Sequence, residues 1–273
     1  MLEVLKEAVE GKGPLHLQQV MLGFKATVIR ELKATFGRQI KVQGCQVHLF
    51  RNWRKKLGKV GNLISWACAQ PSFNKLNKSL HGLCYVPTDK VFEYYRALID
   101  TKMEGICNEL EQRDDLDMEE KDSTKESLNS YLDFLERNYI VRATRTGVSV
   151  PRYPPELWSQ VENCLEGSPL SANTNKGWHS RLKHNLPQNN TIWALLGHLV
   201  NIEAETRTIR DEHRASLNNV VEDEEDGEVE NGPVNNSAYR RRKMRNNLKN
   251  LISHREEYSP FEFLERVSHI EPW

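Results

Sequence analysis

Long apolar runs are missing from this 273-residue chain. No stretch of 18 apolar residues occurs, so we expect no membrane-spanning helix and no membrane partner. The first residues, Met1 to Glu7, carry acids where a signal peptide would carry an apolar core. The five cysteines are odd in number and include no CxxC pair. We therefore expect free thiols in a reducing compartment rather than a disulfide framework.

Several common signatures of enzymes are also missing. The sequence contains no GxSxG nucleophile elbow, no P-loop and no glycine motif for dinucleotides. These absences exclude a motif-based assignment to the hydrolases, nucleotide triphosphatases or dinucleotide-dependent enzymes that use them.

Charge is balanced in total and segregated along the chain. There are 38 Lys and Arg residues against 38 Asp and Glu residues. Between Lys25 and Lys59, ten basic residues face one acid, Glu31. Seven of the nine residues at 222–230 are acidic, and residues 240–249 hold six basic residues and no acid. These blocks are more informative about partners than the neutral total.

Apolar spacing predicts alternating elements in the first sixty residues. The pattern predicts helices over 2–9, 24–36 and 45–57, with short strands over 17–22 and 40–42. Such alternation favours a parallel α/β layer. From residue 63 onward the spacing is almost wholly helical, so we expect an α/β fold that is mostly helical.

One segment runs from Gly44-Cys45-Gln46-Val47-His48 to Trp53-Arg54-Lys55-Lys56-Leu57-Gly58, where a CxxH pair opens a basic helix. Other segments of note lie at residues 17–25, 80–87, 132–140 and 153–158, and at 173–179, which ends in Gly177-Trp178-His179. In their residues and in their order along the chain, these segments resemble the C-terminal part of the transposase domain of Mutator-like elements (MULE transposases). The first segment is similar to that family's strand-to-helix junction.

The resemblance implies a truncated RNase H-like layer with a large helical insertion and a long C-terminal helix. We expect a partial RNase H-like α/β portion at 1–62, a helical insertion at 63–165, and a closing turn with a long helix at 166–217. An acidic disordered linker at 218–238 and a basic C-terminal tail at 239–273 would follow.

In such transposases, three carboxylates hold two Mg²⁺ ions that cut DNA and transfer strands during DNA transposition. The resemblance places the second acid at Gly23 and the third at Lys176, and the first would lie before Met1. We therefore expect a transposase of this DDE nuclease and strand-transferase class that is catalytically inactive, with no catalytic residue and no ligands for Mg²⁺.

Cys45 and His48 are candidate metal ligands, and the resemblance adds His179. A closed zinc site needs four ligands. The alternative is structural, with a buried Cys45 thiol and a His48 that makes hydrogen bonds at a helix start.

Basic residues of the segment 45–59 are candidate DNA ligands. Arg51 and Lys55 are four residues apart, as are Lys55 and Lys59, so they share a helix face opposite Leu49, Trp53 and Leu57. Cations at this spacing neutralise adjacent phosphates. The alternative is an ordinary solvated helix face. The full set predicted to bind DNA is Arg51, Arg54, Lys55, Lys56 and Lys59.

The run Arg240-Arg241-Arg242-Lys243-Met244-Arg245 predicts a nuclear localisation signal or a nucleic-acid-binding arm. The alternative is that it pairs with the acidic run at 222–230.

Together these patterns predict a nuclear protein that binds the DNA phosphate backbone. The alternatives are a non-enzymatic DNA-binding or protein-interaction module derived from a transposase, and a degenerate remnant. The truncated layer would expose a strand edge, so a homo-oligomer or a partner chain is a further expectation.

Overall fold

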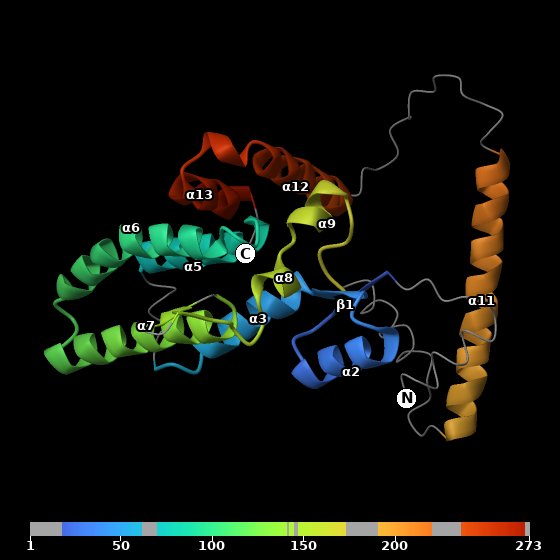
Figure 1. Cartoon of the computed structure of the whole chain (residues 1–273), viewed down its shortest axis with the longest axis horizontal. Coiled ribbons are helices and arrows are strands. Elements are labelled where there is room, and N and C mark those ends of the chain that lie inside the picture. Colours follow the sequence, from blue (N-terminus) through green and yellow to red (C-terminus); the bar gives the residue numbers. More distant parts are fainter. Residues whose placement is uncertain are drawn as a thin grey trace. The chain divides into compact units, whose positions relative to one another are not determined.

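The computed structural model describes residues 18–61, 70–140, 142–144, 147–172, 191–219 and 236–270. The chain forms two units, one of Met1–Ala172 with Tyr239–Trp273 and the other of Asn173–Ala238. Helices dominate the described residues, and the strands form two two-stranded sheets, one of them parallel (Figure 1). The predicted mixed α/β class, mostly helical, is confirmed. No helix in these residues is both long and apolar enough to cross a membrane.

The alternating elements predicted near the N-terminus are present from residue 19 onward. They are β1 (Gln19–Leu22), α2 (Ala26–Phe36), β2 (Lys41–Gly44) and α3 (Gln46–Leu57). The two strands pair in parallel, from Gln19 opposite Lys41 to Leu22 opposite Gly44. Gly37 ends α2 with a φ of 89°, a conformation that favours glycine. The helix predicted over 2–9 lies outside the described residues.

The truncated layer was expected to expose a strand edge, and the outer edge of β2 is covered at its carboxyl end. The segment around α8 (Pro155–Trp158) runs beside the strand. The Gln43 side-chain amide donates to the Ser159 carbonyl at 2.8 Å, and the Gln160 amide donates to the Gly44 carbonyl at 2.9 Å. Buried polar groups need such partners, so these amides tie the small sheet to the helical part.

From residue 70 onward, the described residues of the first unit are mostly helical. They include α5 (Pro71–His81), η1 (Gly82–Tyr85), α6 (Val91–Glu111), α7 (Met118–Asn138), α8 and α9 (Val161–Leu165), with a hairpin of β3 (Arg142–Thr144) and β4 (Gly147–Ser149). Helix α7 starts at a capping box, in which Asp117 accepts from the Glu120 amide and Glu120 accepts from the Asp117 amide. The core includes Trp53, Trp158, Tyr95, Tyr131, Leu98 and Leu135, all almost fully buried.

The segment predicted as a basic C-terminal tail folds onto this core. It forms α12 (Asn236–Ser253), η3 (Arg255–Glu257) and α13 (Pro260–Ile270). Helix α13 packs on α5, α6 and η1. Figure 1 shows it beside α5 and α6. Phe263, Leu264 and Val267 lie on one face of α13 and are fully buried. Helix α13 lies close to the backbone of η1 at Gly82, because a Cβ built on Gly82 would stand 3.2 Å from Leu264 and 3.3 Å from Val267.

The long helix predicted to end near residue 217 is α11 (Ile192–Asn219), which belongs to the second unit. Residues 173–190 of the predicted closing turn and residues 220–235 of the predicted linker lie outside the described residues.

Candidate nucleic-acid interface

Helix α3 has one buried face and one basic face, as its sequence predicts. Leu49 and Trp53 are fully buried and Leu57 is nearly so. On the opposite side, Arg51, Arg54 and Lys55 are exposed, and Lys59 is exposed in the turn that follows. None of these four cations pairs with a carboxylate of the described residues. The structure therefore provides a cluster of four cations, called here the α3 cations, that is open to an anionic partner.

Lys56, the fifth residue predicted to bind DNA, differs from the α3 cations. Its ammonium lies 5.6 Å from the centroid of the Phe134 ring on α7, and the side chain is half-buried. This cation–π contact turns Lys56 toward the protein. We therefore exclude it from the α3 cations.

The buried face of α3 is anchored by a cluster of aromatic rings. Trp53 stacks on His81 with the ring centroids 5.6 Å apart, and it makes edge contacts with Tyr139 and Trp158. Phe50 lies 4.2 Å from the same His81 ring. Burial lowers the pKa of His81 from 6.5 to about 3, so this ring stays neutral near neutral pH. The α3 cations are thus held on a rigid support.

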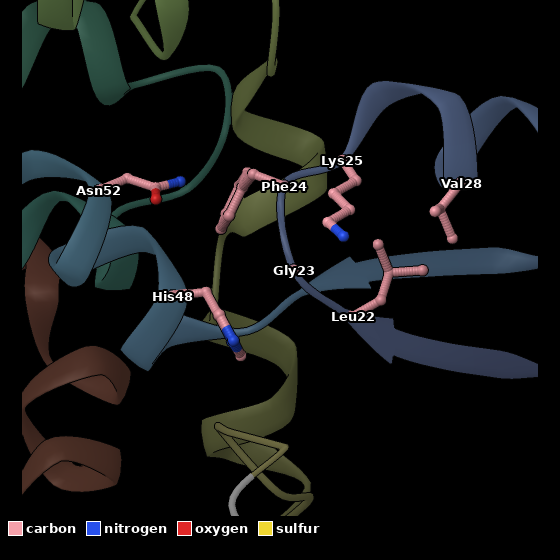
Figure 2. Close-up of a pocket in the computed structure, with 7 residues that line it drawn as sticks. All are labelled: Leu22, Gly23, Phe24, Lys25, Val28, His48 and Asn52. Carbon is pink, nitrogen blue, oxygen red and sulfur yellow. The ribbon is translucent and has the colours of Figure 1, made fainter.

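A cavity of about 330 Å³ lies beside the basic face, at the carboxyl end of β1. In open α/β sheets this end of the strands is the usual place for ligands. Two of the lining residues, His48 and Asn52, lie one turn apart on α3. Arg51 directly precedes Asn52, and Lys55 follows it by three residues. Figure 2 shows the described residues that line it, none of which is a carboxylate: Leu22, Gly23, Phe24, Lys25, Val28, His48 and Asn52.

Several contacts fix the walls of this cavity. The Phe24 ring makes edge contacts with Tyr139 and Tyr153, at centroid distances of 5.8 and 5.3 Å. The Tyr153 hydroxyl donates to the Phe24 carbonyl at 2.9 Å. The Asn52 amide Nδ2 donates to the Tyr139 hydroxyl at 3.3 Å, and burial raises the pKa of Tyr139 to about 12. These contacts leave Phe24 and Asn52 little freedom.

Gly23, where the resemblance places a catalytic acid, lines the same cavity. A Cβ built on Gly23 would lie 3.5 Å from the His48 ring, an ordinary van der Waals distance. The backbone therefore has room for a side chain at a position that carries none. Lys176, the other position of this kind, lies outside the described residues. Within the described ranges, no three His, Cys, Asp or Glu side chains come together as a metal site would require.

The proposed metal ligands Cys45 and His48 have different surroundings. Cys45 is the N-cap residue of α3, is fully buried, and its sulfur accepts the Ala172 N–H at 3.3 Å. His48 borders the cavity beside Gly23. His179 lies outside the described residues, so the three-ligand hypothesis stays a prediction. The contacts of Cys45 fit the structural alternative.

Residues of the basic run near the C-terminus differ in their surroundings. Arg240, Arg242 and Lys243 are exposed on α12. Arg245 instead donates to the carbonyls of Gly167 and Ser168, at 3.0 and 2.8 Å, and fixes α12 to the turn after α9.

Comparisons with family models, curated proteins and solved structures gave no match for this chain. The interpretation of the site therefore depends on its residues and their geometry. Sequence reasoning located the basic face and Gly23, but it missed Lys25 and Asn52 as cavity residues. The sequence could have indicated Asn52, because it stands four residues after His48 on a predicted helix and therefore lies on the same face.

Proposed function

We propose that this chain is a DNA-binding module derived from a MULE-like transposase, and that it holds duplex DNA by its phosphates. The observation that carries the proposal is the set of α3 cations, which are exposed, make no ion pair with described carboxylates and stand on an anchored helix. Cations of this kind displace condensed counterions from DNA, and this displacement supplies most of the affinity that does not depend on sequence.

A substitution experiment tests this proposal. The variant Arg51→Ala/Lys55→Ala/Lys59→Ala removes three α3 cations, and we expect it to bind a labelled 20-base-pair duplex at least tenfold more weakly than wild type at low salt. The matched control Lys33→Ala/Lys75→Ala/Lys78→Ala removes three exposed lysines elsewhere in the chain. Equal weakening in both variants would show that net charge alone matters and would contradict the assignment to α3.

We further propose that β1, α2, β2 and α3 are the remaining part of an RNase H-like layer that no longer cuts DNA. Two-metal cleavage needs carboxylates around the ions, and Gly23 supplies none beside the cavity. Supercoiled plasmid incubated with the wild-type chain and Mg²⁺ should stay supercoiled. Nicking that disappears with a chelator would refute this part of the proposal, and the double variant Gly23→Asp/Lys176→Glu tests whether acids at the two positions restore cleavage.

For localisation, we propose that the exposed Arg240, Arg242 and Lys243 serve nuclear import. Their side chains are open to a receptor, whereas Arg245 is used within the fold. A fluorescent fusion of the full chain should accumulate in nuclei, and the Arg240→Ala/Arg242→Ala/Lys243→Ala variant should not. Equal distribution of the two fusions would contradict this role.

A second candidate function, protein interaction, is favoured by α11. Trp193, Leu196 and Val200 follow at intervals of three and four residues, and their exposed fractions are 76%, 47% and 63%. A row of large apolar side chains on a helix is typical of a helix–helix contact. We propose self-association through this row. Sedimentation of the wild type as a dimer and of Trp193→Glu as a monomer would support it, and a monomeric wild type would refute it.

A further inference from the structure

We propose that the cavity at the carboxyl end of β1 receives one unpaired nucleotide of the DNA bound by the α3 cations. This inference rests on the proposed DNA-binding function and adds a ligand for the cavity. It assigns the phosphate of that nucleotide to Lys25 and its base to the wall formed by Phe24 and Asn52 (Figure 2).

The size and lining of the cavity point to a ligand with both apolar and charged parts. A volume of about 330 Å³ is at the lower end of small-molecule pockets, which span about 300 to 1,000 Å³, and is roomier than a bare inorganic anion needs. Leu22, Phe24 and Val28 supply apolar surface, while Lys25, His48 and Asn52 supply polar groups. A nucleotide combines a flat, partly apolar base with a charged phosphate, so it matches both kinds of surface.

Lys25 is the group suited to the phosphate. Its side chain is exposed and forms no ion pair with a carboxylate of the described residues. It is the N-cap residue of α2, and the first turn of that helix contains no acid. Both the ammonium and the positive end of the helix dipole therefore favour an anion at the mouth of the cavity.

Phe24 and Asn52 are suited to the base. The edge contacts of Phe24 with Tyr139 and Tyr153 hold its ring in place, and a fixed aromatic ring is a stacking surface for bases of any sequence. The bond from Asn52 Nδ2 to Tyr139 fixes the orientation of the amide. Asn52 still has its Oδ1 acceptor and a second Nδ2 hydrogen, the pair of groups that recognises a base edge.

The cavity is also in the right place for a strand bound on α3. His48 and Asn52 flank Arg51 on the same helix, and Lys55 follows one turn later. A phosphate bound at Arg51 or Lys55 therefore brings neighbouring nucleotides of its strand to the cavity. A paired base cannot enter, because pairing keeps it stacked in the duplex. The inference thus predicts a preference for DNA ends or gaps with an unpaired nucleotide.

The test compares a blunt duplex with the same duplex carrying a one-nucleotide overhang, placed at the 5′ end in one substrate and at the 3′ end in another. Wild type should bind one of the overhang duplexes about tenfold more tightly than the blunt duplex. Gly23→Leu, which places a side chain in the cavity, and Lys25→Ala, which leaves the packing unchanged, should each reduce this ratio toward one. Lys33→Ala, a change at an exposed lysine of α2, should keep it.

A second probe separates this inference from the proposed function. A 5′-phosphorylated dinucleotide with 2-aminopurine is too short to span the α3 cations, so quenching of its fluorescence by wild type, but not by Gly23→Leu, reports the cavity alone. Salt-dependent binding of the blunt duplex, with an overhang ratio of one and no quenching, would overturn only this inference. Quenching without any duplex binding would overturn the proposed function and leave the nucleotide site supported.

Discussion

Mild acid should destabilise the fold through His81, whose ring lies against Trp53 beneath α3. Burial lowers the pKa of His81 from 6.5 to about 3. The unfolded chain therefore binds a proton at a pH where the folded chain does not. Stability from the neutral ring is fully present above pH 6.5 and decreases as the pH falls from 6.5 toward 3. Between pH 7.5 and pH 5, linkage gives a loss of about 2 kcal/mol in the free energy of unfolding.

Urea unfolding followed by tryptophan fluorescence measures this loss, because the chain has six tryptophans and Trp53 contacts His81 directly. The matched variant His81→Phe keeps an aromatic ring at the site and cannot take up a proton. Its free energy of unfolding should change by about 2 kcal/mol less than that of wild type over the same pH interval.

The chosen interval limits the contribution of surface carboxylates. The pKa values of Glu111, Asp115 and Glu262 are lowered from their ordinary values, mainly by hydrogen bonds with Lys125, Arg113 and Ser259, so these groups protonate largely below pH 5. An equal pH dependence in wild type and His81→Phe would refute the reasoning, because it would mean that the ring is protonated in the folded chain.

Three further substitutions test other parts of the structure. Gly44→Ala should cost about 2 kcal/mol, because its Cβ would stand 2.7 Å from the Phe24 ring and 3.0 Å from the Leu157 carbonyl; urea unfolding measures this cost. Phe263→Ala should cost about 3 to 5 kcal/mol and increase amide exchange in α5 and α6, whereas an isolated tail would show neither change. Lys56→Ala should weaken duplex binding less than Lys55→Ala, because Lys56 lies over Phe134; equal weakening in an anisotropy titration would place Lys56 with the α3 cations.

The sequence was most informative where local signals and packing agree. The strands and helices between residues 19 and 57 fall within a few residues of their predicted positions. Glycines 23, 37 and 58 directly follow the ends of β1, α2 and α3, and the apolar spacing within the elements is regular. The basic face of α3 followed from the same periodicity. Exposure of Arg51 and burial of Trp53 are fixed by their positions on one helix.

Features that depend on distant contacts were not predictable in this way. The docking of α13 depends on Leu264 and Val267 meeting a surface some 180 residues earlier, at Gly82. Lys56 follows Lys55 in the same basic run, and its contact with Phe134 on α7 cannot be read from that run. The cavity depends on the return of Tyr139 and Tyr153 to Phe24 and Asn52, which no local pattern encodes.

The salt dependence of duplex binding tests the central claim most directly. If the four α3 cations each contact one phosphate, log K should fall with log salt at a slope of about −3.6, which is a loss of about 150-fold between about 50 and 200 mM salt. The Arg51→Ala/Lys55→Ala/Lys59→Ala variant should then show a slope of about −1. A wild-type slope near zero, or the same slope in both proteins, would contradict DNA binding through α3.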